Sequence, residues 1–377
     1  MANTLKFGAG NWATKEGSTL AYNDENNNFK PLPFTFTRAS SGTVVNKAGL
    51  IETVGNGIPR IDFLGNTNGA LLLEPQSTNI IPYSEDFNSG WAQYGSPTIN
   101  TSSIISPNGT LNGSKITRGS NATPLRYASL TSTGTQYTFS LYAKKGSVDK
   151  IYLDIGDVAD VEFTLTDEWQ RFEITQTPTT FTHIDISFGT STSGDNFYIY
   201  GAQLEAGSYS TSLINTQGST VTRVQDVCKI VNSPILQATN QFTLFFDAKD
   251  FVNYGATFAN IMITLGAGES PYDAGSGIHI YNKNWYYFNG SSAVTLGNCY
   301  NATTDSKFAI SYDGTKFTRY SNGVKLGTNT TSASMSNWDT LTNGSLSYSG
   351  VDRVFNIADL KVYNTALTDQ ELQALTS

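Results

Sequence analysis

Short runs in which apolar and polar residues alternate recur along most of the chain at intervals of roughly 10–15 residues. Turn-forming Gly, Asn, Asp and Ser residues separate these runs. Alternation with a period of two places successive side chains on opposite faces of a β-strand, whereas no helical period competes over residues 81–207. In that region we expect strands at Ser114–Thr117, Tyr137–Ala143, Lys150–Ile155, Glu162–Leu165, Gln170–Thr175, His183–Phe188 and Phe197–Ala202.

The same pattern resumes after residue 240. There we expect strands at Phe242–Ala248, Ala259–Leu265, Ile278–Tyr281, Asn284–Phe288, Lys307–Tyr312, Lys316–Ser321, Val324–Leu326 and Phe355–Tyr363. The pairs Asp313-Gly314 and Asn322-Gly323 are typical two-residue hairpin turns. Near the end, Thr368 with Glu371 three positions later predicts a capped helix that ends near Leu375.

These patterns predict an all-β fold with five regions. Residues 1–33 form a polar N-terminal arm, and residues 34–80 form a small β-rich collar with a turn at Asn46–Gly49. Residues 81–207 and 240–377 are expected to be two antiparallel β-sandwiches of the jelly-roll type, joined by a connector at 208–239. The short C-terminal helix completes this fold.

Two pairs of segments resemble each other. Leu73-Glu74 and Leu204-Glu205 begin similar stretches, and Arg38 and Arg223 each follow a threonine. We interpret the pairs as two similar exits from one domain into the next. Chance similarity in a chain of low diversity is the alternative.

Composition narrows the classes of function. Only 14% of the 377 residues are charged, and the net charge of −8 leaves no basic surface for nucleic acid. No apolar run is long enough to predict membrane insertion, and the first residues lack the apolar core of a signal peptide. We therefore expect synthesis in a cytoplasm without a signal peptide.

The two cysteines, Cys228 and Cys299, allow one disulfide at most. Neither belongs to a Cys-x-x-Cys pair, which argues against a cysteine-based zinc site. Buried thiols are the expectation from the base rate for cytosolic proteins.

Candidate catalytic or metal-binding residues are few. His183 and His279, the only histidines, lie in different regions, so we expect hydrogen-bonded strand histidines and no enzymatic activity. Asp154, Asp157 and Asp160 with the neighbouring Glu162 form the densest acidic group. A solvated strand edge is the favoured interpretation, with Ca²⁺ binding or glycoside hydrolysis by paired carboxylates as alternatives. We expect no cofactor.

Aromatic side chains beside Asn- and Ser-rich turns are the candidates for glycan binding, because a sugar's apolar face stacks on an aromatic ring. They are Trp91 and Tyr94 in the first sandwich, and Trp285 and Tyr287 in the second. Alternation places Trp285 and Tyr287 on one strand face, so either that face or the opposite one is buried. Burial in the core is the alternative for all four.

Several segments together resemble a known protein family. They are Phe36–Glu52, Pro59–Asp62, Leu71–Asn79, Tyr83–Phe87 and Trp91. This set resembles a module of tailed-bacteriophage virion proteins such as head and tail fibres. Residues 81–207, which close with Ile199–Gly207, resemble a carbohydrate-binding-module-like sandwich. Residues 240–377, with Ile357–Leu372, resemble a concanavalin A-like, laminin-G-type jelly roll.

The resemblance implies a non-enzymatic virion protein, a fibre or capsid decoration subunit located in the virion and usually trimeric. The N-terminal regions would attach it to capsid or tail proteins, with Trp12, Phe34, Arg38 and Arg60 as expected attachment or subunit contacts. The sandwiches would display surfaces that bind host glycans. An exported bacterial protein that binds or cleaves glycans, and a purely structural spacer, are the alternatives.

Overall fold

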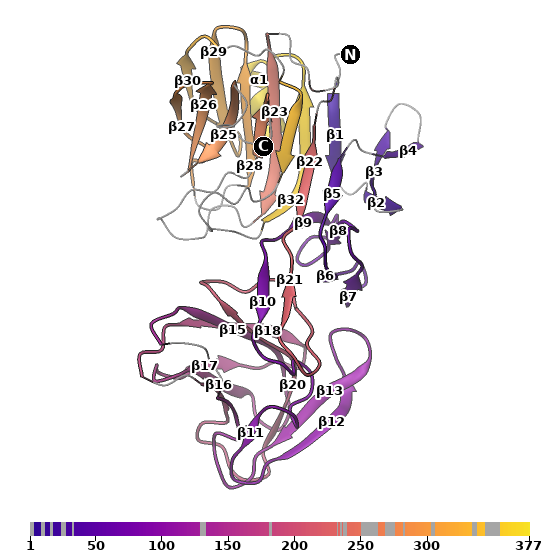
Figure 1. Cartoon of the computed structure of the whole chain (residues 1–377), viewed down its shortest axis with the longest axis vertical. Helices are drawn as coiled ribbons and strands as arrows, with labels where there is room; N and C mark the ends of the chain where they lie inside the picture. The colour runs from indigo at the N-terminus through magenta and orange to yellow at the C-terminus, as the bar shows by residue number, and fades with distance from the viewer. Residues whose placement is uncertain are drawn as a thin grey trace.

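The computed structural model describes residues 4–8, 12–15, 18–23, 28–31, 34–128, 133–180, 183–231, 233, 236, 240–249, 263–267, 276–281, 283–302, 306–333, 338–343 and 355–377. Nearly all regular structure in this part of the chain is β, as expected, and every strand pairing in it is antiparallel. Figure 1 shows two β-bodies, one above the other, with collar strands between them.

The lower body, here called the first sandwich, consists of two sheets that enclose one apolar core. The distal sheet contains, in spatial order, β11 (Ala92–Gln93), β14 (Leu125–Tyr127), β19 (Ile184–Ser187), β16 (Lys150–Ile155) and β17 (Val161–Thr164). The junction sheet contains β12 (Thr98–Ile105), β13 (Leu111–Thr117), β20 (Asn196–Ala206), β15 (Tyr137–Lys145) and β18 (Gln170–Gln176). Alternate residues such as Leu153 and Phe139 are fully buried between the sheets, which is the packing that period-two sequences favour.

The upper body, the second sandwich, draws strands from the whole length of the chain. One sheet contains β30 (Val324–Thr330), β29 (Lys316–Ser321), β28 (Lys307–Tyr312), β23 (Phe242–Lys249), β32 (Phe355–Tyr363), β9 (Ala70–Leu73) and β8 (Arg60–Asp62), with β1 (Thr4–Gly8) also paired to β32. The other contains β27 (Ala293–Asn298), β26 (Asn284–Asn289), β25 (Ser276–Tyr281), β24 (Ile263–Gly266), β31 (Thr340–Asn343), β22 (Val227–Ile230) and β5 (Thr35–Thr37).

The collar is therefore not a separate module, contrary to the division expected from the sequence. Its strands β5, β8 and β9 extend the sheets of the second sandwich, and β22 of the connector does the same. Phe36, Leu71 and Leu73 lie in the same apolar core as Phe242 and Trp285. The sequence pattern showed strands in the collar but not their partners, because those partners lie far away along the chain.

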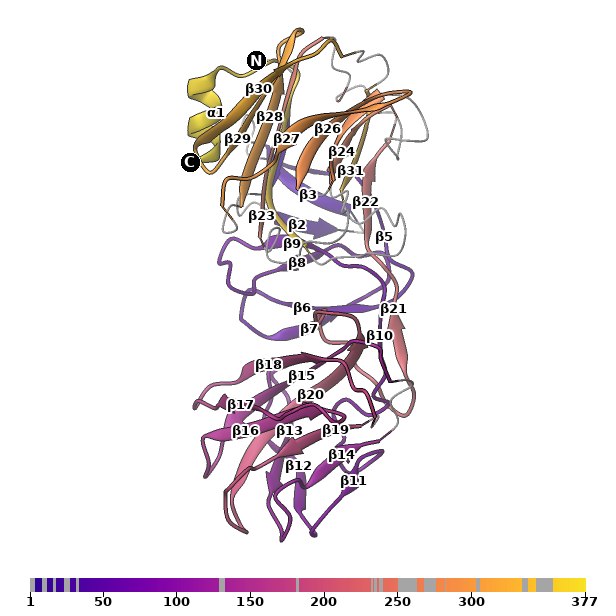
Figure 2. The ribbon, with the colours of Figure 1, turned by 90° about the vertical axis from the view of Figure 1, so that its left-hand side faces the viewer.

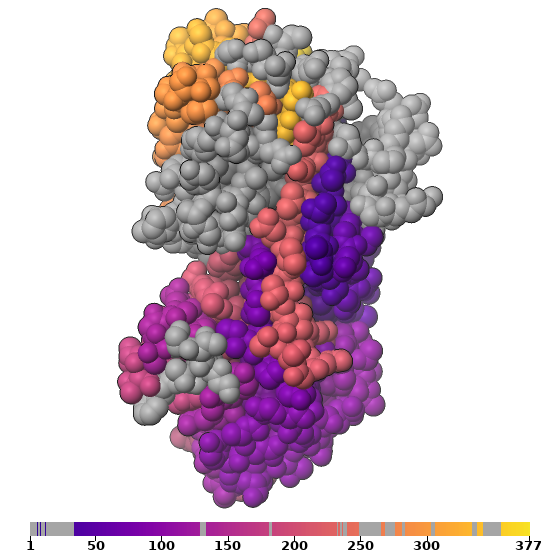
Figure 3. Space-filling model, in the orientation of Figure 1, coloured from indigo at the N-terminus to yellow at the C-terminus, as the bar shows by residue number. Residues whose placement is uncertain are grey.

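Two strands connect the bodies. The chain leaves the second sandwich through β10 (Ser77–Asn79) and returns through β21 (Val221–Arg223), and these strands pair with each other. Figures 1 and 2 both show them side by side between the bodies. In Figure 3, residues in the connector form a salmon-coloured band along this junction.

The remaining elements lie beside the second sandwich, except for the collar hairpin, whose Ile51 packs against Tyr200 of the first sandwich. They are β2 (Trp12–Lys15), β3 (Ser18–Asn23) and β4 (Asn28–Pro31), which form a small sheet, the collar hairpin of β6 (Gly42–Val45) and β7 (Ile51–Val54), and the helix α1 (Asp369–Thr376). The predicted capping box of Thr368 and Glu371 is present. Among the described residues, no helix is long and apolar enough to cross a membrane.

The hairpin turn at Asn322-Gly323 follows its sequence signal, whereas at the other predicted turn Asp313 N donates to the carbonyl of Lys316, so that Gly314 and Thr315 form the turn. At Asn322-Gly323 both residues have positive φ, 39° and 77°, between β29 and β30, which is the conformation that this dipeptide favours. Strands that the alternation failed to predict include β12 and the two strands of the connector. Of the predicted strand Ala259–Leu265, residues 259–262 lie outside the described residues.

Candidate ligand-binding site

A buried cluster of charged side chains occupies the junction between the two bodies. Arg38 donates from Nη1 to Asp226 Oδ1 at 3.0 Å, and Arg60 bonds the other oxygen of Asp226. Arg60 Nη1 lies 2.7 Å from Glu74 Oε2, and Arg223 Nε lies 3.4 Å from the same oxygen. All five side chains are at most 1% exposed, so each charge depends on the others for stabilisation.

Glu74 also binds the segment that leaves the first sandwich. Its carboxylate accepts 2.6 Å hydrogen bonds from the backbone N and Oγ of Ser212. Burial alone would raise the pKa of Glu74, but the charges of Arg223 and Arg60 and the Ser212 bonds outweigh it and lower the pKa to about 2. A second bond, from Thr43 Oγ1 to the carbonyl of Leu213 at 2.6 Å, ties the same segment to the collar.

Beside this cluster lies a pocket of about 260 Å³ between the collar and the outer face of the junction sheet. The collar, the connector and both sandwiches contribute residues to its wall, and ligand sites often lie between domains in this way. The lining residues are Thr43, Val44, Val45, Ile51, Asp62, Leu64, Leu72, Glu74, Tyr142, Arg171, Glu173, Ser210, Thr211, Ser212, Leu213 and Asn356.

Polar groups of several kinds line the pocket around one aromatic ring. Arg171 lies over the ring of Tyr142, its cross-strand neighbour, with its guanidinium carbon 5.7 Å from the ring centroid. Arg171 Nη2 donates to Ser140 Oγ at 2.9 Å, but its buried Nε has no hydrogen-bond partner among the described residues. Asn356 Oδ1 is likewise buried without a partner there. Such groups favour a ligand that satisfies them.

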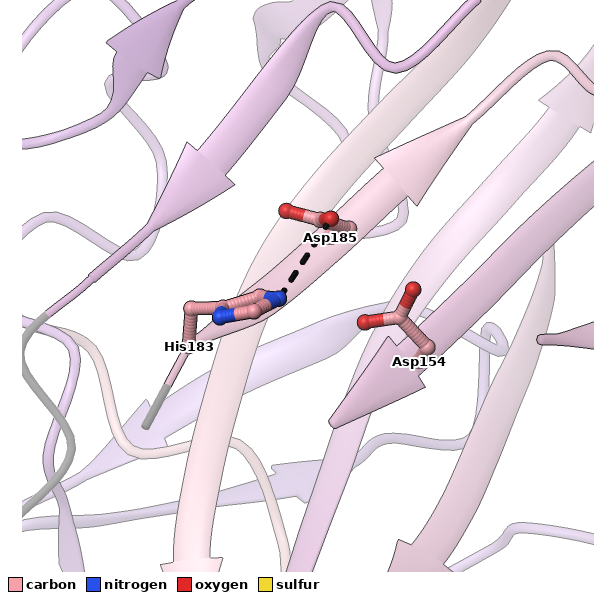
Figure 4. A group of neighbouring side chains, drawn as sticks. All are labelled: Asp154, His183 and Asp185. Carbon is pink, nitrogen blue, oxygen red and sulfur yellow. Dashed lines mark ion pairs between the residues drawn. The ribbon is translucent and has the colours of Figure 1, made fainter. Parts of the chain in front are cut away.

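A second group of polar side chains lies on the outer face of the distal sheet. Asp154, His183 and Asp185 each offer one donor atom, and these atoms lie within 4.8 Å of one another. Asp154 and Asp185 are direct cross-strand neighbours on β16 and β19, and His183 precedes Asp185 by two positions and therefore shares its face. Figure 4 shows the three side chains converging.

Burial and neighbouring charges shift the pKa values of two of these groups. Burial and the nearby carboxylates of Asp185 and Asp160 raise the pKa of Asp154 to about 8. Burial lowers the pKa of His183, although the charge of Asp185 acts in the opposite direction. Arg126 forms a bidentate pair with Asp185, in which Nε donates to Oδ1 at 2.7 Å and Nη2 donates to Oδ2 at 2.6 Å.

The acidic group expected from the sequence does not converge as a unit. Asp157 accepts hydrogen bonds from Thr179 and Thr180, and these bonds hold its pKa below the usual range. Glu162 pairs with Lys150 across β16 and β17. Asp160 is exposed, and of the three candidates for Ca²⁺ only Asp154 belongs to the converging set. The two residues that join Asp154 come from another strand, which spacing along the chain does not show.

Three of the four aromatic candidates for glycan binding are buried, so their expected exposure was wrong. Trp285 and Tyr287 are 0% and 2% exposed in the core of the second sandwich, because their strand face is covered by the facing sheet. Trp91 packs between Phe87 and Tyr127. Tyr94 is 42% exposed, and the guanidinium of Arg126 lies over its ring.

The four expected attachment contacts also differ in position. Arg38 and Arg60 are wholly buried in the junction cluster, so an outward contact by either is contradicted. Trp12 donates from Nε1 to the carbonyl of Gly69 at 3.1 Å, which places it against the collar of its own chain. Phe34 is half-buried and packs on the core of the second sandwich. Cys228 and Cys299 are both buried in that core and form no disulfide with each other.

Comparison with known proteins leaves the family open. No protein-family model matches the chain, and no curated protein matches it. One similar solved structure is of botulinum neurotoxin type C, whose cell entry is described as dependent on two ganglioside molecules. It has 14% identity, a TM-score of 0.31 and 40% coverage of both chains. Thus this chain spans less than half of the toxin chain.

Two other solved structures are also similar. The Ruminococcus gnavus IT-sialidase CBM40 bound to α2,3-sialyllactose has 17% identity and a TM-score of 0.29, covering 38% of this chain and 85% of that one. A mutant Trypanosoma rangeli sialidase that displays trans-sialidase activity has 14% identity and a TM-score of 0.30, covering 39% of this chain and 25% of that one. At these scores the similarities establish no function.

Proposed function

We propose that this chain is a non-enzymatic, glycan-binding structural protein of a bacteriophage virion, a head or tail fibre or decoration subunit. The observation that carries glycan binding is the pocket at the junction, where buried Arg171 Nε and Asn356 Oδ1 lack partners among the described residues. The attachment role is supported by the sequence resemblance of residues 36–91 to virion modules. Assembly as a homotrimer follows from the same resemblance.

The pocket suits a single sugar ring. Its volume of about 260 Å³ is below the roughly 300–1,000 Å³ of sites for drug-sized ligands. Sugar hydroxyls both donate and accept, so the carboxylates of Asp62 and Glu173 and the two unpartnered groups are matching partners. The partly buried ring of Tyr142 offers apolar contact.

The full chain should be screened on an array of bacterial surface glycans, followed by calorimetry with the saccharides that bind. Arg171→Gln and Asn356→Ala are each expected to weaken binding by about tenfold or more, because each removes a buried hydrogen bond to the ligand. Arg118→Gln, an arginine of the same sandwich outside the pocket, is the matched control. Equal saccharide binding by all variants would exclude this pocket as the glycan-binding site. Binding to no glycan on the array would favour a purely structural spacer.

The virion role needs a separate experiment. Imaging of the assembled particle with an antibody to this chain should place it on the head or tail in multiples of three copies. Absence of the chain from purified particles would contradict the proposal. Release of sugar from the polysaccharides that bind would contradict the non-enzymatic part alone.

A further inference from the structure

The outer face of the distal sheet carries a second site that does not depend on the proposed function. Asp154 is only 9% exposed, and its Oδ1 has no hydrogen-bond partner among the described residues. Figure 4 shows its carboxylate pointing toward His183 and Asp185. A buried carboxylate oxygen without a donor is costly unless another group satisfies it, and here donor atoms of His183 and Asp185 lie within 4.8 Å of a carboxylate oxygen of Asp154.

We propose that Asp154, His183 and Asp185 bind one divalent transition-metal ion of the Zn²⁺ class. The three donor atoms lie within 4.8 Å of one another, a separation that a single ion with bonds of about 2 Å can span after small side-chain movements. One imidazole nitrogen with two carboxylates is a donor set that suits Zn²⁺ or Mn²⁺. Ca²⁺ prefers oxygen ligands throughout, so the histidine makes it the poorer fit.

The strands hold these ligands in place. Asp154 alternates with Leu153 and Ile155, which are fully buried in the core, so its backbone position is fixed by packing. Asp185 lies between two buried isoleucines on β19 in the same way. Ligands on adjacent strands of a sheet are more precisely positioned than ligands on loops.

Arg126 is the neighbouring group that the proposal must accommodate. Its bidentate hydrogen bonds occupy one lone pair on each oxygen of Asp185, and each oxygen keeps a second lone pair for a metal. Arg126 would then orient the ligating carboxylate, as outer hydrogen-bond partners do at metal sites. The metal must displace the proton that Asp154 holds near neutral pH, and the carboxylates of Asp154, Asp185 and nearby Asp160 then outnumber this one cation.

Three protein ligands leave at least one coordination position. The side chains of His183 and Asp185 are 13% and 7% exposed, so the site is close to the surface and a water molecule or an external ligand can reach it. Three-ligand sites with an open position differ in this respect from closed structural zinc sites, which use four protein ligands.

The test uses the full chain, freed of metal with a chelator and titrated with ZnCl₂ by calorimetry. We expect one Zn²⁺ per chain, with binding weakened about tenfold or more in Asp154→Asn and in His183→Gln. Glu162→Gln is the matched control, because it removes one negative charge from the same sheet but lies outside the set. Thermal melts without metal should show that each variant is folded.

A crystal of the wild-type chain soaked in Zn²⁺ provides a measurement that needs no variant. Anomalous scattering at the zinc edge should place the ion between the three side chains. The proposal is overturned by no anomalous peak there, by wild-type affinity in Asp154→Asn, or by Ca²⁺ binding as tightly as Zn²⁺. Saccharide binding by the junction pocket is tested separately, because its variants at Arg171 and Asn356 lie on β18 and β32, outside the distal sheet.

Discussion

The buried charge of Glu74 makes the stability of the folded protein depend on pH. The arginines that stabilise its charged form lie beside it only in the folded protein. Folding therefore lowers the pKa of Glu74 from an ordinary value near 4.5 to about 2. Between these two values the unfolded chain binds a proton that the folded chain does not bind. Stability from Glu74 is therefore complete above about pH 4.5 and is lost as the pH falls through 2.

Glu74→Gln should be destabilising at pH 7, by about 3–5 kcal/mol, because it leaves Arg60 and Arg223 with less compensating charge. The difference from wild type should shrink as the pH is lowered from 4.5 toward 2. Urea unfolding at a series of pH values measures both effects. Glu168→Gln, at an exposed position, is the control, and a difference that does not depend on pH would contradict the mechanism.

Trp285 belongs to the core, and its substitution should act on folding. Trp285→Ala is expected to lower the free energy of unfolding by about 3–5 kcal/mol, because the side chain is fully buried against Phe246. Tyr94→Ala should lower it by less than about 1 kcal/mol, since that ring is 42% exposed and contributes mainly its contact with Arg126. Chemical denaturation of both variants decides this, and similar losses would contradict the assignment.

At the scale of residues, the sequence predicted which side chains share a strand face but not whether that face is buried. Alternation correctly paired Trp285 with Tyr287, yet whether their face was buried depended on the opposite sheet. The acidic group was judged by spacing along the chain, whereas Asp154 meets its partners across the sheet. His183 and Asp185, two positions apart in an alternating run, were the sequence signal for that side of the site.

At the scale of elements, local patterns were sufficient for many strands and for the helix. β16, β28, β29 and β32 have the bounds that alternation predicted, and the Asn-Gly turn joins the strands it was expected to join. β21 and β22 were missed because they are short and lie in a Ser/Thr-rich connector. Their stability comes from pairing with distant strands, which a local pattern does not contain.

The first strand of the arm should matter for the second sandwich. β1 pairs with β32 over five residue pairs, from Thr4↔Tyr363 to Gly8↔Asp359. Removing residues 1–33 exposes this part of β32 as an unpaired edge, so we expect lower stability and a tendency to aggregate. The sequence-based expectation was only that the arm attaches the chain to capsid or tail proteins.

Differential scanning calorimetry should show the transition of the second sandwich moving to lower temperature, while that of the first sandwich is unchanged. Gly8→Ala tests the same contact without shortening the chain. Gly8 has a φ of 100°, and an added Cβ would lie 2.2 Å from the carbonyl oxygen of Ala358. Unchanged transitions in both variants would show that β1 contributes little.

At the scale of the whole molecule, the two bodies differ in independence. The core of the first sandwich comes entirely from residues 81–204, whereas the core of the second includes residues from 36 to 362. We expect a fragment of residues 77–216 to fold alone. A fragment of residues 240–377 should not, because it lacks β5, β9 and β22.

Circular dichroism and urea unfolding of the two fragments check this. A cooperative transition for 77–216 and none for 240–377 is the expected result. If 240–377 unfolds cooperatively by itself, the collar strands are accessory and the five-region division made from the sequence is the better description. The full chain serves as the reference for both transitions.

The pairing of β9 with β32 has a consequence for biosynthesis. Leu72 pairs with Asn356, so β9 emerges from the ribosome about 280 residues before its partner on β32. At translation rates of about 5–20 residues per second, this delay is roughly 15–60 s. During that time the apolar run Ala70–Leu73 lacks this partner, whereas the first sandwich is completed within the same window and is able to fold. Nascent chains should therefore be most prone to aggregation in this window, and chaperones that bind exposed apolar segments should be recruited then.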